Sequence, residues 1–90
     1  MIIEIHCKRW LLPKKTWGIV LYPFIFYRRK YYSETLRRHE WTHIRQIRRD
    51  GVFKFYFKIL KDYATVGYRN SPYEIEAYEK QEDEDYEPWK

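Results

Sequence analysis

Cysteine and long apolar runs are scarce in this 90-residue chain. The single cysteine, Cys7, cannot form an internal disulfide, which excludes the disulfide framework of a small secreted domain. The longest apolar run, residues 19–27, contains a proline and falls far short of the roughly 20 residues that cross a bilayer. The N-terminus carries charged side chains where a signal peptide needs an apolar stretch. We therefore expect a soluble, cytoplasmic chain without a transmembrane segment.

Aromatic residues, by contrast, are abundant, at 21% of the chain. Each aromatic side chain buries a large area, so a compact core is feasible although 34% of the residues are charged. A chain of this size forms one domain, and bound metal or a partner would add welcome stability. We predict a single domain over residues 1–80.

Charge is distributed unevenly along the chain. Residues 1–70 hold 16 Lys or Arg and 5 Asp or Glu, a balance of +11, whereas residues 71–90 hold 2 and 8, a balance of −6. Residues 81–90 are predicted to form an acidic, flexible tail. Basic and aromatic residues alternate in residues 28–32 and 45–61, which would suit single-stranded nucleic acid or a membrane interface. The mixture suits the two equally, and without a nucleic-acid-binding signature it stays a minor interpretation of the chain.

The N-terminal third favours β-strands. Residues 2–9 alternate loosely between apolar and polar side chains, and residues 16–29 are rich in β-branched and aromatic residues. Pro23 cannot donate a ladder hydrogen bond, so it marks an edge, a bulge or the break between two strands. We expect a short antiparallel sheet of two or three strands.

Helices are predicted for the remainder, which makes the fold class α+β. Ser33 is a suitable N-cap and Gly51 suits a helix end, which predicts a helix from residue 34 to 49. A second helix is predicted over about residues 52–64. Its expected apolar face consists of Phe53, Tyr56, Phe57, Leu60 and Tyr63.

The third predicted helix begins after Ser71, with Pro72 at its first position and Glu74 at its third. The spacing from Ser71 to Glu74 also fits a capping box, in which the carboxylate would bond back to the Ser71 amide.

The first predicted helix contains a motif that carries chemistry, HExxH, formed by His39, Glu40 and His43. Residues four apart share a helix face, so both imidazoles can point at one metal ion. Glu40 lies to the side of that pair, where it can accept a proton from metal-bound water. Zn²⁺ is the expected ion, and it needs a third protein ligand if water is to occupy the fourth position.

Two segments, residues 38–46 around HExxH and residues 70–78 around Glu74, resemble small gluzincin-type zinc metallopeptidases of the minigluzincin kind. The resemblance implies a minimal zincin-like domain in which His39, His43 and Glu74 bind zinc and Glu40 is the general base. Tyr78 stands where many relatives have Asp, and its hydroxyl is a candidate to support a ligand. Glu76 remains an alternative third ligand, although it lies about 200° around the helix from Glu74.

The predicted function is zinc-dependent hydrolysis of peptide bonds in a peptide or protein substrate. The alternative is a non-catalytic, zinc-stabilised module that binds nucleic acid or a protein through its basic and aromatic surfaces. Four tyrosines are candidate donors to the carbonyl oxygen, and nothing in the sequence selects one: Tyr56, Tyr63, Tyr68 and Tyr78. The sequence does not determine the oligomeric state.

Overall fold

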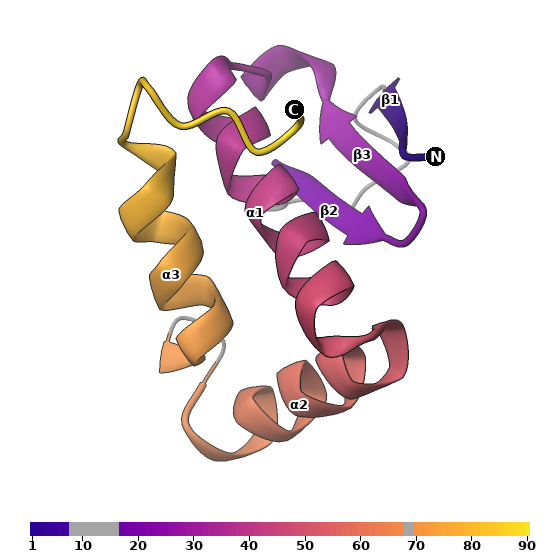
Figure 1. Cartoon of the computed structure of the whole chain (residues 1–90), viewed down its shortest axis with the longest axis vertical. Coiled ribbons are helices and arrows are strands. Elements are labelled where there is room, and N and C mark those ends of the chain that lie inside the picture. Colours follow the sequence, from indigo (N-terminus) through magenta and orange to yellow (C-terminus); the bar gives the residue numbers. More distant parts are fainter. Residues whose placement is uncertain (8–16, 68–69) are drawn as a thin grey trace.

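The computed structural model describes residues 1–7, 17–67 and 70–90. Within these ranges three strands are followed by three helices (Figure 1). The strands are β1 (Ile3–Cys7), β2 (Gly18–Leu21) and β3 (Phe24–Arg28), and a short 3-10 turn (Arg29–Tyr31) follows β3. The helices are α1 (Glu34–Asp50), α2 (Val52–Thr65) and α3 (Pro72–Gln81). The predicted α+β class is confirmed.

The sheet has the order β1-β3-β2, with β3 in the centre. β2 and β3 form an antiparallel hairpin whose turn contains Pro23, so this proline marks the predicted break between two strands. β1 pairs with β3 in parallel, with Ile3 opposite Phe24. The prediction of a wholly antiparallel sheet is therefore wrong. β1 and β3 are separated by residues 8–23 rather than by a tight turn, and a long connection permits parallel pairing.

Helix α1 begins and ends where the sequence predicts. The Ser33 hydroxyl accepts a hydrogen bond of 3.1 Å from the Leu36 amide, which caps the first turn. At the other end, Gly51 has a φ of 95° and its amide donates to the Ile47 carbonyl at 2.7 Å. A positive φ favours glycine, so the chain can leave α1 at this point and start α2 immediately.

Helix α2 buries a different face from the predicted one. Phe55 is its buried residue, and Val52, Tyr56 and Ile59 are partly buried against the core. Of the five residues expected to face inward, only Tyr56 does so. The other four are 66–90% exposed: Phe53, Phe57, Leu60 and Tyr63. Apolar side chains of α2 point to several sides of the helix, so their spacing in the sequence alone could not identify the side that faces the core.

The core lies between the sheet and the helices, with α1 in the centre of the molecule (Figure 1). α3 packs along one side of α1, and the sheet lies on the other side. The buried core residues are Val20, Ile25, Tyr27, Trp41, Ile44, Ile47, Phe55 and Tyr73. None of the helices in the described part of the chain is long and apolar enough to cross a membrane.

The C-terminal residues after α3 lie against α1. Arg45 donates hydrogen bonds of 3.0 Å to the carbonyl oxygens of Pro88 and Lys90. The guanidinium of Arg37 lies 4.3 Å from the centre of the Trp89 ring, a cation–π contact. The acidic residues 82–85 are exposed. Flexibility of residues 81–90 stays a prediction, but their last residues have defined contacts.

Candidate metal centre

Helix α1 presents two buried imidazoles one turn apart. His39 and His43 are only 6% and 5% exposed, and their ring centroids lie 5.0 Å apart. This is the arrangement that the i, i+4 spacing of the motif predicts. Buried histidines need polar partners, so the groups around them show what the site is built to hold.

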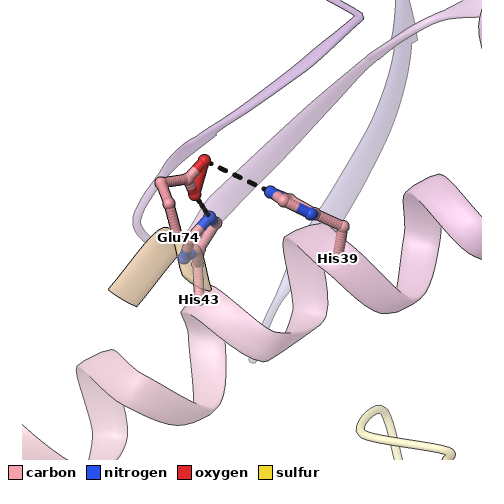
Figure 2. A group of neighbouring side chains, drawn as sticks. All are labelled: His39, His43 and Glu74. Carbon is pink, nitrogen blue, oxygen red and sulfur yellow. Dashed lines mark hydrogen bonds and ion pairs between the residues drawn. The ribbon is translucent and has the colours of Figure 1, made fainter. Parts of the chain in front are cut away.

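Glu74 of α3 completes a cluster with these two histidines (Figure 2). Its side chain is 1% exposed. One carboxylate oxygen, Oε1, lies 3.3 Å from His39 Nε2, and the other, Oε2, lies 2.7 Å from His43 Nε2. One ligand atom from each of the three residues lies within 4.8 Å of the others. The group could therefore hold a metal ion.

The capping box considered for α3 does not form. The Ser71 hydroxyl donates to Asp62 at 3.0 Å and makes no cap bond to the helix. The Glu74 carboxylate is thereby free to face α1. Glu76 lies away from the cluster, where it accepts a hydrogen bond of 2.6 Å from Gln46 and lies 3.6 Å from Arg49. Of the two carboxylates predicted as alternatives, only Glu74 meets the histidines.

Gln46 fixes the orientation of the His43 ring. Its amide nitrogen donates to the Tyr73 carbonyl at 3.0 Å and to Glu76 at 2.6 Å. Its amide oxygen therefore faces His43 Nδ1, 2.8 Å away, and must accept a hydrogen from it. A neutral His43 then carries its proton on Nδ1 and presents the lone pair of Nε2 to Glu74.

Gln81, at the end of α3, does the same for His39. Its amide nitrogen donates to Glu82 at 3.1 Å, which leaves the amide oxygen facing His39 Nδ1 at 2.6 Å. The Gln81 carbonyl is in turn bonded to Arg38 at 2.7 Å, which anchors the helix end to α1. A neutral His39 therefore also directs its Nε2 lone pair at Glu74.

These hydrogen bonds bring two imidazole lone pairs and a carboxylate to one point. With neutral imidazoles all three groups are acceptors there, so they repel one another unless a proton or a metal cation lies between them. Glu74 Oε2 is buried and has no hydrogen-bond partner among the described residues, although His43 is near. Hydrogen bonds to Nδ1 that orient the ligand nitrogen are typical of histidines that bind metals. The residues present therefore fit a metal ion.

The electrostatics of the cluster also favour a cation. Burial alone would raise the pKa of Glu74, but the neighbouring imidazoles of His39 and His43 lower it below its usual range. Burial would lower the pKa of His43, but Glu74 and Glu40 reverse this effect and raise it. The carboxylates thus create a negative potential at the imidazoles, which attracts positive charge.

Glu40 is a buried carboxylate beside the cluster and against strand β2. Burial raises its pKa, which His43 and His39 partly offset. The causes of this shift are burial and neighbouring charges rather than hydrogen bonds, which suits a carboxyl group that exchanges a proton. A methyl group added at Gly18 would lie 3.4 Å from Glu40 Cγ and 3.2 Å from the Phe26 carbonyl. Glycine at position 18 therefore lets β2 approach Glu40 closely.

The tyrosines named as candidate donors occupy different positions around the cluster. The Tyr78 ring packs edge-on against His39, with ring centroids 4.6 Å apart, and its role as a donor stays a prediction. The Tyr56 hydroxyl donates to the Val20 carbonyl at 2.8 Å and accepts from the Tyr22 amide at 3.0 Å. Tyr63 is 66% exposed on α2. Tyr68 lies outside the described residues.

Sequence reasoning missed three residues of the site: Gly18, Gln46 and Gln81. Gln46 is three residues after His43, a spacing that places both on one helix face. Gln81 follows Glu74 by seven residues on α3, which also indicates a shared face. Gly18 has no such local signal, because its importance comes from the approach of a strand to a distant helix.

Comparisons with known proteins add no assignment. Scans of the chain against protein-family models, curated proteins and solved structures found no match.

Proposed function

We propose that the chain is a zinc-dependent metallopeptidase. The observation that carries the proposal is the buried cluster of His39, His43 and Glu74, in which two oriented imidazoles and one carboxylate converge. Two nitrogens and one oxygen form a ligand set used by catalytic zinc sites, in which water takes the fourth position. Bound zinc would polarise a peptide carbonyl and lower the pKa of that water.

Glu40 is the proposed general base. It belongs to the HExxH motif, and its carboxyl group is close enough to His39 and His43 for their charge to lower its pKa. Its raised pKa brings the carboxyl group closer to neutral pH, where it can both take up and return a proton. In the proposed reaction Glu40 accepts a proton from water and delivers it to the leaving amine.

Strand β2 is the proposed support for an extended substrate. It lies at the edge of the sheet, and its Gly18 end adjoins Glu40. A peptide can add to such an edge through main-chain hydrogen bonds. The Tyr56 hydroxyl already occupies the Val20 carbonyl and the Tyr22 amide. A substrate strand would therefore pair with β2 at its Gly18 end, beside the general base.

A second function, zinc binding without catalysis, is favoured by the burial of the cluster. All three candidate ligands are no more than 6% exposed, and closed sites are typical of structural zinc. Under this alternative the ion links α1 to α3 and stabilises the fold. Glu40 would then have no catalytic role, and a glutamine at position 40 would serve equally well.

The Glu40→Gln variant separates the two functions. We expect elemental analysis to find about one zinc ion per chain in the wild type and in Glu40→Gln. Cleavage of a peptide library should fall by about 10²- to 10⁴-fold in the variant, because the general base is lost. A zinc-loaded wild type that cleaves no peptide would favour the structural function. Absence of zinc after reconstitution would contradict both.

A further inference from the structure

The outer face of α2 carries an apolar stripe formed by Phe53, Phe57 and Leu60. These side chains are 90%, 74% and 70% exposed. Their spacing of four and three residues places them on one side of the helix. Single exposed apolar residues are common, but three large ones in one line form a patch of the kind that marks an interaction site.

The stripe does not result from a weakly attached helix. Phe55 on the inner face is 4% exposed and stacks on Tyr73, with ring centroids 4.7 Å apart. Tyr56 links the helix to β2 through its hydroxyl. With the inner side fixed in this way, rotation of α2 to bury the stripe would break the core. The outer face is therefore a stable surface of the protein.

A row of lysines borders the apolar stripe. Lys54, Lys58 and Lys61 are exposed, and the helical rotation of 100° per residue groups them on one flank of α2. Asp62, the acidic residue of α2, accepts a hydrogen bond from the Ser71 hydroxyl at 3.0 Å. The surface next to the stripe is therefore cationic. A partner that binds both features must carry negative charge and an apolar region.

The acidic segment lies at the other end of the molecule. Residues 82–85 follow α3 near the start of α1, whereas α2 extends from the opposite end of α1 (Figure 1). The basic, apolar face of α2 and the exposed acidic segment thus lie at opposite ends of the molecule. An anionic surface would attract the first and repel the second, which orients the protein.

We propose that α2 docks on an anionic phospholipid surface. The helix is about 21 Å long and would lie in the plane of the interface. Phe53, Phe57 and Leu60 would enter the boundary of the acyl chains, and the lysines would contact the phosphate groups. Single-stranded nucleic acid would contact the lysines and could stack bases on Phe53 and Phe57, but it would leave the aliphatic side chain of Leu60 without an apolar partner. A second copy of the chain would cover the stripe without supplying negative charge.

Co-sedimentation with vesicles tests this proposal. The full chain should bind phosphatidylcholine vesicles that contain about a quarter phosphatidylserine at least tenfold more strongly than pure phosphatidylcholine vesicles. Phe57→Glu should reduce binding to the anionic vesicles by more than tenfold. The double variant Lys54→Gln/Lys61→Gln should weaken binding by roughly fivefold for each charge removed.

The matched control is Arg29→Gln/Lys30→Gln, which removes the same charge from exposed residues near the other end of α1. It should bind almost as strongly as the wild type, and circular dichroism should show that all variants are folded. Failure to bind anionic vesicles would overturn the proposal, as would undiminished binding by Phe57→Glu. The wild type could instead fail to bind vesicles and form dimers that Phe57→Glu dissociates. That result would assign the stripe to self-association.

Discussion

The interface between α1 and α3 and the outer face of α2 depart from ordinary protein architecture in opposite directions. The first buries ionisable side chains, His39, His43 and Glu74, at 6% exposure or less. The second exposes large apolar side chains, including Phe53 at 90%. Folding alone favours the reverse in both places, because burial of polar groups costs free energy and burial of apolar groups releases it.

The two regions differ in how their cost is compensated. In the buried cluster each imidazole has a dedicated hydrogen-bond acceptor, Gln46 or Gln81, and the remaining acceptors converge on one point. The outer face of α2 has only a bordering row of lysines. The difference indicates that the buried cluster is arranged to hold a small cation inside the fold. The exposed stripe is arranged to contact a surface outside the protein.

Loss of Glu74 should have the largest effect on the buried region. Glu74→Ala removes one of three proposed ligands and should weaken zinc binding by more than a hundredfold. This corresponds to about 3 kcal/mol, which is roughly a quarter of the free energy of a typical zinc site. Competition with a chromogenic chelator measures this affinity. Glu79→Ala is the control, because Glu79 is an exposed carboxylate on the same helix, and it should bind zinc nearly as well as the wild type. Undiminished zinc binding by Glu74→Ala would assign the third ligand to another residue, such as Glu76.

The glutamines that orient the imidazoles should contribute next. Gln81→Leu removes the acceptor for His39 Nδ1 and should reduce zinc affinity by about 10- to 100-fold. Gln81→Glu keeps an acceptor at this position and should retain affinity close to that of the wild type. Equal losses in both variants would show that Gln81 acts by packing rather than by orienting the ring. The same chelator competition measures both.

The sequence was most informative where the governing forces are local. Ser33 and Gly51 predicted the ends of α1, because caps depend on a few adjacent residues. The HExxH spacing placed His39 and His43 on one face for the same reason. Glu74 was harder to place, since the capping box competed for its carboxylate. The resemblance favours Glu74 over Glu76, and Glu74 lies four residues before Tyr78, on the same helix face.

The sequence was least informative where distant segments decide the outcome. The parallel pairing of β1 with β3 depends on the path between them, and no residue pattern specifies it. The inner face of α2 depends on the direction in which the turn at Gly51 aims the helix. The contact of Gly18 with Glu40 requires the sheet and α1 to be packed already. Each of these features is tertiary, so periodicity and propensity could not reveal it.

Glu4 provides a second comparison, a carboxylate whose partners are all hydrogen-bond donors. It accepts from Arg37 at 2.9 Å, Tyr27 at 2.8 Å and Trp41 at 3.0 Å. Burial would raise the pKa of Glu4, but these donors, led by Arg37, lower it to about 2. Unlike Glu74, Glu4 needs no added ion.

The depressed pKa of Glu4 makes stability depend on pH. The contribution is fully present above the usual value of 4.5 and is lost as the pH falls towards 2. We expect a loss of about 2 kcal/mol in the free energy of unfolding, after allowing for partial exposure of the side chain. Urea denaturation at several pH values between 2 and 4.5 measures the change. In Glu4→Gln the free energy of unfolding should depend less on pH in this range. An unchanged pH dependence in Glu4→Gln would assign the effect to other carboxylates.

The smallest effect is expected on the outer face of α2, where Phe57 and Phe55 offer the same side chain in opposite environments. Phe57→Ala should change the free energy of unfolding by no more than about 0.5 kcal/mol, because the ring is already in water and alanine suits a helix. Phe55→Ala should cost about 3–5 kcal/mol, since it empties a packed site beside Tyr73. Urea denaturation of both variants measures the contrast. Similar losses would mean that the outer face is covered in the isolated protein. A neutral Phe57→Ala would instead show that folding does not require an aromatic ring at this position, which leaves binding as the reason for its presence.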